Sequence, residues 1–486
     1  MTLLMKKERN LPLLLLFLFS GLLLVDAIVP EVRSTAGCGF LPIFAVIYCY
    51  GGQSSANLNT TGPISRDVLV KINLTTYTSV SDMQGGWDSV DARAEPNYYF
   101  AFAAIPDEDA FFVDGGVGAG NQGATLATYN STIFDIETNK WEDDIDAKPG
   151  GRVYAHTAVY KQDTRKVYVW GGLGNLYTGI PVGSINPQDM YIYDLATSEW
   201  TAGSTAPVSR RYHSATLVDS SIYFIGGEYR DTTVTAGSSA ASMDSIIVFD
   251  TDGGTWRTVT TIGPVPGTRI RHTATLIPNT NRIVLFGGKI PGDGNGHNQD
   301  YFHILNVDGE QLRWEDSSKT TAGPNSATSF SISGIYGHSA VIVENNLFII
   351  FGYGNTNGGS YSQNNIYVLD LETFEWRSSI SAVTPEPQPT ETSTSEPTHV
   401  DPDAISAGTI AGAVVGAVVG VSVIAGIAFF FLRRKRRQSQ EELENQSSGD
   451  RMLPAEDDIP PPSYSKNENS QRLLAPNPQY RKYFIF

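Results

Sequence analysis

The chain has 486 residues, long enough for one large domain with further segments at its ends. Hydrophobic residues make up 41% and aromatic residues 11% of it, which fits a globular protein rather than a disordered one. The formal net charge is −17, so the chain lacks the basic balance of proteins that bind nucleic acid or anionic lipid. We therefore expect no nucleic-acid partner.

The amino end has the layout of a secretory signal. Lys6, Lys7 and Arg9 precede an apolar run over residues 11–25, and the small residue Ala27 follows. We predict a signal peptide over residues 1–27, cleaved after Ala27. The alternative is an uncleaved membrane anchor, for which the apolar run is short.

Cys38 and Cys49 are the two cysteines of the chain. They fall on successive predicted strands of one hairpin, so a bridge across that hairpin is geometrically feasible. In the oxidising compartment that a signal implies, a single pair normally forms a disulfide. We expect this bridge to staple the first repeat. A redox or catalytic thiol is the alternative, but no Cys-x-x-Cys motif is present.

One unit recurs six times between residues 49 and 352, with a spacing of about 60 residues. Each unit has an apolar strand ending in a glycine pair, a polar loop, and a second strand leading to Asp-x5-Trp. The strand ends are Gly51-Gly52, Gly115-Gly116, Gly171-Gly172, Gly226-Gly227, Gly287-Gly288 and a degenerate Gly352-Tyr353. The second motif reads Asp135…Trp141, Asp194…Trp200, Asp250…Trp256, Asp308…Trp314 and Asp370…Trp376, with Asn73 and Ser79 in these places in the first unit. This pattern predicts an all-β propeller.

The repeated residues have structural roles. Glycine pairs permit backbone conformations that are closed to side chains and let neighbouring blades approach. The Trp supplies apolar surface for the next blade, and the Asp can accept hydrogen bonds from amides of its turn. His156, His213, His272 and His338 also recur, about fourteen residues before their glycine pairs. A metal-binding ring of imidazoles is conceivable, but a repeated residue more often serves a turn or an inter-blade contact. We predict no metal and no cofactor.

Glycine pair, aromatic strand and Asp-x5-Trp together resemble the kelch repeat, the family that also contains the propeller domain of galactose oxidase. The resemblance implies a kelch propeller over residues 28–380, with six blades. A seventh blade would have to lie within residues 82–96, and residues 28–34 could add a closing strand to the last blade. The copper site of galactose oxidase uses two His, two Tyr and a thioether-linked Cys. Here the cysteines are expected to pair with each other, so we predict no enzyme of that type.

Composition changes after Trp376. Residues 381–404 are rich in Pro, Thr and Ser, which predicts an extended, O-glycosylated stalk. Residues 405–432 form an uncharged apolar run followed by Arg433-Arg434-Lys435-Arg436-Arg437, which predicts one transmembrane helix with a cytoplasmic carboxyl side. Residues 433–486 are then a disordered cytoplasmic tail. We expect a type I protein of the plasma membrane or another secretory-pathway membrane, a layout similar to single-pass kelch proteins of fungal genomes.

Two motifs of the anchor and tail predict partners. Glycines at four-residue spacing form one smooth helix face that favours a homodimer, although small residues are also simply common in membrane spans; they are Gly408, Gly412, Gly416 and Gly420. In the tail, Pro461, Pro462 and Tyr464 form a PPxY motif, the ligand of WW domains. This resemblance implies recruitment of a WW-containing ubiquitin ligase and modification of Lys435 or Lys466. The alternative is a chance proline run in a disordered segment.

Three N-glycosylation triplets begin at Asn59, Asn73 and Asn130. With the other features they favour a non-catalytic surface protein that binds an extracellular protein or glycan through long loops at residues 174–187, 229–243 and 291–298. One alternative is a membrane-tethered oxidoreductase or sugar-modifying enzyme, which bound copper or iron and turnover of a sugar alcohol would reveal. The other is an intracellular kelch scaffold of cell polarity, which requires that the amino-terminal run is neither signal nor anchor.

Overall fold

A computed structural model describes most of the predicted propeller. It covers residues 27–54, 64–65, 69–92, 95–118, 130–142, 145, 148–180, 184–230, 238–292, 300–316, 331–356 and 359–387. The predictions for the signal peptide up to residue 26, for Asn59, for residues 388–404 of the stalk, for the transmembrane helix with its glycine face, and for the PPxY tail lie outside these residues. Within the described residues, no helix has both the length and the apolar character needed to cross a membrane.

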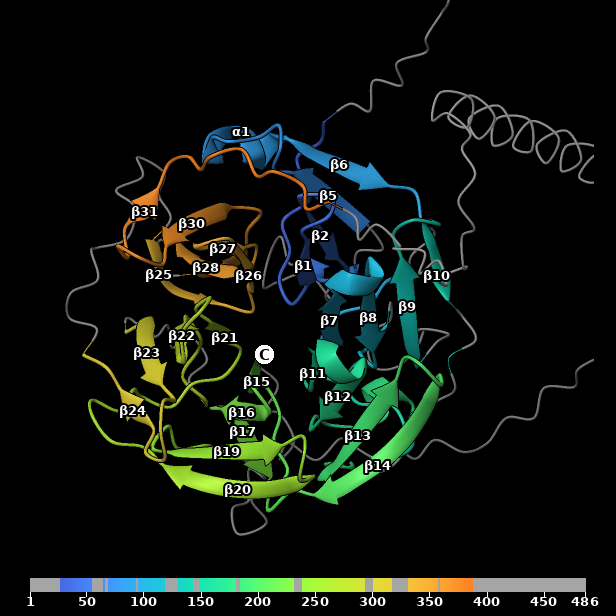
Figure 1. Cartoon of the computed structure of the whole chain (residues 1–486), viewed down its shortest axis with the longest axis vertical. Helices are drawn as coiled ribbons and strands as arrows, with labels where there is room; N and C mark the ends of the chain where they lie inside the picture. Colours follow the sequence, from blue (N-terminus) through green and yellow to red (C-terminus); the bar gives the residue numbers. More distant parts are fainter. Residues whose placement is uncertain are drawn as a thin grey trace, which may run out of the picture. The chain divides into compact units, whose positions relative to one another are not determined.

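Six antiparallel four-stranded sheets are arranged as blades around a central axis (Figure 1). In each blade the first strand is innermost and the fourth is outermost. Blade 1 contains β1 (Gly37–Leu41), β2 (Val46–Tyr50), β5 (Leu69–Asn73) and β6 (Trp87–Val90); blade 2 contains β7 (Ala101–Ile105), β8 (Ala110–Asp114), β9 (Ser131–Asp135) and β10 (Lys140–Glu142); blade 3 contains β11 (Thr157–Lys161), β12 (Lys166–Trp170), β13 (Asp189–Asp194) and β14 (Glu199–Thr205); blade 4 contains β15 (Ser214–Val218), β16 (Ser221–Ile225), β19 (Ser245–Asp250) and β20 (Thr255–Thr260); blade 5 contains β21 (Thr273–Leu276), β22 (Arg282–Phe286), β23 (Phe302–Asn306) and β24 (Arg313–Trp314); blade 6 contains β26 (Ser339–Val343), β27 (Asn346–Ile350), β30 (Ile366–Asp370) and β31 (Trp376–Arg377). The predicted six-bladed, all-β propeller is confirmed.

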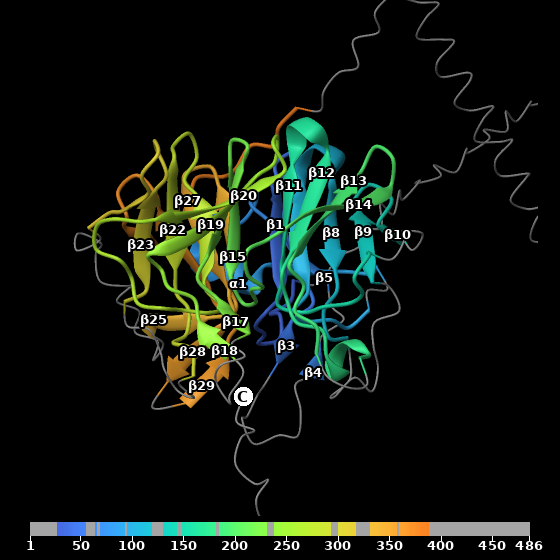
Figure 2. The same cartoon turned by 90° about the horizontal axis from the view of Figure 1, so that it is seen from below.

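The two faces of the ring differ. We call the face where the second strands end and the inner strands begin the loop face, and the opposite face, with the short turns between first and second strands, the hairpin face. Small accessory sheets extend from the loop face (Figure 2). They are formed by β3 (Gln53–Ser54) with β4 (Ile64–Ser65), by β17 (Glu228–Arg230) with β18 (Ser238–Ala240), and by β25 (Ser331–Tyr336), β28 (Tyr353–Thr356) and β29 (Gly359–Ser362). The described helices are short: α1 (Val80–Gly85) and the 3-10 turns η1 (Pro106–Glu108), η3 (Gln162–Thr164) and η4 (Leu176–Thr178).

The region proposed for a seventh blade belongs to blade 1. Residues 82–96 contain the end of α1 and the outer strand β6. Trp87 pairs with Ile72 in the way that Trp256 pairs with Phe249 in blade 4. The tryptophan of the first unit is therefore Trp87. Ser79, the position where the repeat predicts it, instead caps α1 by accepting a hydrogen bond from an amide of the first turn. The prediction failed because α1 is inserted between the turn and the outer strand.

Two other motif assignments were wrong, by two positions in blade 5 and by one position in blade 6. In blade 5 the residue after the Trp-paired Leu305 is Asn306, and its side-chain oxygen accepts a hydrogen bond from the Asp308 amide at 2.8 Å. Asn306, rather than Asp308, is therefore the turn acceptor that corresponds to the repeated Asp. In blade 6 the pair after β27 is Phe351-Gly352, with φ of +62° and +100°, and not Gly352-Tyr353.

The second glycine of each pair bonds its blade to the next one. Its N–H donates to a carbonyl just before the next inner strand, at 2.8 to 2.9 Å: Gly52 to Asn97, Gly116 to Val153, Gly172 to Arg210, Gly227 to Arg269, Gly288 to Ile335 and Gly352 to Arg33. The last of these bonds joins blade 6 to blade 1 and closes the ring. At Gly52, φ is +96° and an added Cβ would lie 2.9 Å from the Ser34 carbonyl oxygen, so both conformation and space require glycine.

The carboxyl end of the propeller completes the closure. We call residues 378–386 the C-terminal strap, because they cross from blade 6 onto blade 1. The N–H of Ile380 donates to Thr78 O at 2.8 Å, that of Val383 to Leu74 O at 3.0 Å, and that of Glu386 to Pro42 O at 3.1 Å. The closing strand expected from residues 28–34 is reduced to isolated bridges, of Ile28 with Trp87 and of Arg33 with Gln363.

Blade 1 also carries the disulfide. Cys38 and Cys49 lie opposite each other on β1 and β2 and are bonded, as predicted. Cys49 is fully buried in an apolar cluster shared by blades 1 and 6, which also contains Trp87 and Phe351. The seam between the first and last blades is thus packed as well as hydrogen-bonded.

Candidate functional site: the channel mouth and the loop face

Six residues with left-handed backbone surround the axis at the loop-face end of the channel, one from each blade. Their φ angles lie between +54° and +61°: Thr35, Tyr99, Ala155, Tyr212, Arg271 and Gly337. Backbone N–H groups bond them in series, from Thr35 to Gly337 O (2.7 Å), Gly337 to Arg271 O (2.8 Å), Arg271 to Tyr212 O (3.1 Å), Tyr212 to Ala155 O (2.9 Å) and Ala155 to Tyr99 O (2.8 Å). This series of backbone hydrogen bonds fixes the backbone positions from which the side chains around the channel extend.

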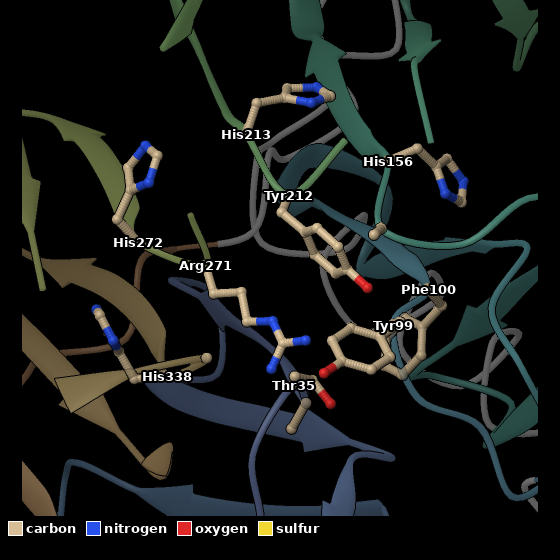
Figure 3. A pocket seen from close by; sticks show the side chains of 12 residues that line it. Thr35, Tyr99, Phe100, His156, Tyr212, His213, Arg271, His272 and His338 are labelled. Atoms are coloured by element: carbon tan, nitrogen blue, oxygen red, sulfur yellow. The ribbon is translucent and has the colours of Figure 1, made fainter. Parts of the chain in front are cut away.

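The ring and the residues that follow each of its members line a cavity of about 140 Å³. Tyr99, Tyr212 and Arg271 point towards its middle (Figure 3). The guanidinium carbon of Arg271 lies 5.0 Å from the centre of the Tyr99 ring and 4.8 Å from that of Tyr212. The channel mouth therefore presents one cation packed against two aromatic rings, which also contact each other with centroids 5.6 Å apart.

The four repeated histidines are inter-blade contacts, as expected for a repeated structural residue. Each Nε2 bonds a group of the preceding blade: His156 to Asp114 Oδ2 (2.7 Å), His213 to Thr157 Oγ1 (2.9 Å), His272 to Ser214 Oγ (3.0 Å) and His338 to Thr273 Oγ1 (2.8 Å). Their imidazoles stand apart around the channel and do not converge (Figure 3). Within the described ranges, no three His, Cys, Asp or Glu residues are grouped so as to hold a metal ion.

Burial keeps these imidazoles neutral. It lowers the pKa of His272 and of His338 to about 3, and that of His213 well below its usual value. A neutral imidazole can donate from Nε2 to the hydroxyl or carboxylate of the preceding blade without placing a charge between the sheets.

A buried charged cluster between blades 2 and 3 was not predicted. Asp114 ends β8, and its carboxylate accepts hydrogen bonds from His156 and from Ser131 Oγ (2.5 Å), with Lys148 Nζ at 4.0 Å. Burial would raise the pKa of Asp114, but the Lys148 ammonium and the two hydrogen bonds lower it below its usual value. The sequence contains a signal for this cluster. Asp114 directly precedes its glycine pair, and the other five units have an apolar or aromatic residue at that position.

The predicted contact loops all belong to the loop face. Residues 174–187 begin with a bridge between Gly174 and Ile185 and contain η4, and residues 229–243 contain most of β17 and all of β18. Of residues 291–298, Pro291 and Gly292 lie within the described part of the chain. The large hydrophobic side chains that the described residues expose all lie in segments that leave a glycine pair or lead into an inner strand: Val29, Leu176, Ile185, Val265 and Ile290.

The two described glycosylation triplets lie at different places. The side-chain oxygen of Asn73 accepts hydrogen bonds from the amide and the hydroxyl of Thr75, in a turn of the hairpin face. That of Asn130 accepts from Arg152 Nε at 3.2 Å, beside the start of β9. Glycan attachment at either asparagine stays a prediction.

Comparisons with known proteins agree with the fold. Residues 45–260 match the family model described as Attractin/LZTR1 beta-propeller, and residues 233–399 match that of the KLHDC2/KLHL20/DRC7 Kelch-repeats domain. Neither description names a catalytic activity.

Similar curated proteins match about half of this chain. Kelch domain-containing protein 3 of Mus musculus is 27% identical over 266 residues, which cover 52% of this chain and 63% of that protein. Acyl-CoA-binding domain-containing protein 4 of Arabidopsis thaliana is 27% identical over 239 residues, 46% and 30% of the two chains. Host cell factor of Drosophila melanogaster is 23% identical over 287 residues, 53% and 17% of the two chains. The chain thus spans less than two thirds of each of these relatives. Its six blades and glycine pairs, together with these matches, show that the chain contains a kelch-repeat β-propeller domain.

Proposed function

We propose that this protein is a non-catalytic type I surface protein whose propeller binds a protein partner through the loop face. The observation that carries the proposal is the distribution of exposed aliphatic side chains. Leu176 is 51% exposed and Ile290 is 38% exposed, and both lie with Ile185 and Val265 in segments of the loop face. Val29, the fifth exposed large hydrophobic residue of the described part of the chain, instead lies beside the bridge of Ile28 with Trp87. Apolar side chains gathered on one rim are typical of protein interaction sites.

The path of the chain also supports the loop face as the binding surface. The C-terminal strap ends beside Pro42, in the turn between β1 and β2, and therefore leaves the propeller on the hairpin face. The loop face is the opposite one, so the strap leaves it uncovered for a partner.

The apolar rim can be tested by reversing its character. In the full-length chain at the cell surface, Leu176→Glu combined with Ile290→Glu should weaken capture of the partner at least about tenfold, because two charges would have to be desolvated in the interface. Ala196→Glu combined with Thr197→Glu adds the same two charges to an exposed turn of the hairpin face and serves as the matched control. The partner is identified by proximity labelling on intact cells and by a screen of surface proteins and glycans. Equal binding by all three proteins would refute the loop face as the contact surface.

The topology has a separate test. Protease added to intact cells should digest the propeller and leave an epitope at the carboxyl end protected. If the propeller is spared while the tail is cut, the orientation is reversed and the receptor role is refuted.

The tail would couple binding to trafficking through the PPxY motif and a WW-domain ligase. Tyr464→Ala should then slow internalisation, with Tyr480→Ala in the same tail as its control. Unchanged uptake in Tyr464→Ala would remove the WW-domain partner from the proposal.

A further inference from the structure

The channel mouth contains a partly buried cation without a counter-ion among the described residues. No carboxylate of the described ranges lies within 4.0 Å of the Arg271 guanidinium, and its Nε is buried without a hydrogen-bond partner there. A guanidinium that is partly withdrawn from water and lacks an anionic partner costs free energy, so this arrangement is poised to bind a negative charge.

Two other arginines near the same face, Arg269 and Arg211, are satisfied within the fold. Arg269 donates to Gly287 O at 3.1 Å and to Asp300 O at 2.9 Å, and Arg211 pairs with Glu228 Oε1 at 2.7 Å. Because these contacts satisfy both guanidinium groups, the two arginines have a structural role. Arg271 differs because its side chain points to the axis, where the neighbouring groups are aromatic rings (Figure 3).

We propose that Arg271, packed against Tyr99 and Tyr212, anchors a single carboxylate group of the bound partner. This inference rests on the proposed protein-binding function and names the chemical group that enters the channel. The two rings hold the guanidinium by cation–π contact, and its N–H groups remain free to form the paired hydrogen bonds that carboxylates accept from arginine.

The surroundings suit an anion of this size. Burial raises the pKa of Tyr99 well above its usual value, so its hydroxyl stays protonated and can donate a hydrogen bond. The cavity of about 140 Å³ is several times the ~30 Å³ share of one water molecule, which leaves room for a carboxylate with part of its side chain. The carboxylate could come from an acidic side chain or from the end of a polypeptide, and the chemistry of the site is the same.

The first experiment titrates full-length protein with benzoate and with benzamide, its neutral isostere, and measures binding by saturation-transfer NMR. We expect benzoate to bind and benzamide not to bind. Arg271→Gln should weaken benzoate binding roughly 10- to 100-fold, since hydrogen bonds to a charged group are lost. Arg271→Lys keeps the charge without the paired donors and should fall between. Arg313→Gln removes an exposed arginine of the same blade and should bind benzoate as the wild type does.

A second pair of probes separates the two sources of the group. One is a blocked peptide, acetyl-Ala-Ala-Glu-Ala-Ala-amide, and the other is acetyl-pentaalanine with a free carboxyl end. Preference for the first assigns an acidic side chain, and preference for the second assigns a chain terminus. Benzoate binding that Arg271→Gln leaves unchanged, in a protein whose unfolding temperature is also unchanged, would overturn the site. So would binding of inorganic phosphate without binding of benzoate.

Failure here can be told apart from failure of the proposed function. If benzoate does not bind but the Leu176→Glu, Ile290→Glu protein still loses its partner, the carboxylate site is refuted and the loop face is supported. If benzoate binding depends on Arg271 while the Leu176→Glu, Ile290→Glu protein keeps every partner, the loop face is refuted as the contact surface and the carboxylate site is supported.

Discussion

Replacing Asp114 with asparagine should destabilise the propeller strongly. The side chains of Asp114 and Lys148 are 1% and 3% exposed, so removing the carboxylate leaves an ammonium group in a dry place between blades 2 and 3. Its remaining described partners are the Gly151 carbonyl oxygen at 3.0 Å and the Tyr191 ring at 4.8 Å. Breaking one side of a buried ion pair costs about 3–5 kcal/mol.

The geometry places the expected loss at the lower end of that range. The two charged atoms are 4.0 Å apart, and an asparagine side chain could still accept the hydrogen bond from Ser131. We therefore expect Asp114→Asn to lower the free energy of unfolding by about 3 kcal/mol. Denaturant unfolding followed by tryptophan fluorescence would measure the change in midpoint at constant slope.

A double substitution isolates the cause. Asp114→Asn with Lys148→Met removes both charges and keeps an apolar stem of similar length, so it should recover most of the lost stability. A single variant that loses less than about 1 kcal/mol would refute the argument, because that is the size of an exposed pair. A double variant no more stable than Asp114→Asn would show that the hydrogen bonds, and not the stranded ammonium, set the cost.

Two further predictions concern the seams between blades. The pKa of His272 and of His338 is about 3 in the folded protein and about 6.5 in the unfolded chain, so between these values the unfolded state binds more protons and stability falls as the pH drops below about 6.5. At pH 5 each histidine should cost about 2 kcal/mol relative to pH 7.5, and a denaturant midpoint that is equal at the two pH values would contradict this. Replacing both cysteines with serine should cost about 3 kcal/mol for a cross-link of this loop length, and an unchanged midpoint under oxidising conditions would show that the bridge adds nothing to stability.

The fold could be predicted from the sequence where a local requirement repeats. Glycine pairs mark the ends of the second strands because their backbone conformation and close inter-blade contact leave no room for a side chain, so counting them gave the number of blades. The motif search failed where different residues meet the same requirement. Asn306 accepts the same turn hydrogen bond as Asp, Phe351 adopts the left-handed conformation of a first glycine, and α1 separates Asn73 from Trp87.

The candidate site was less predictable because its members come from different blades. The histidine of each Tyr-Ala-His, Arg-Tyr-His, Ile-Arg-His and Tyr-Gly-His triplet was recognised, but the residue that faces the channel is the one before it. Only the closed ring brings Tyr99, Tyr212 and Arg271, which are far apart in sequence, around one axis. No spacing along the chain encodes that meeting.

The C-terminal strap also determines how the propeller would carry mechanical load. A pull on the chain beyond residue 387 acts on backbone hydrogen bonds to Thr78, Leu74 and Pro42, all of which belong to blade 1. Force would therefore enter the blade whose first two strands are joined by the Cys38–Cys49 bond, and that covalent link resists separation of the two strands. Under a pull at that end, the blade with the covalent cross-link would therefore be the first to carry the force.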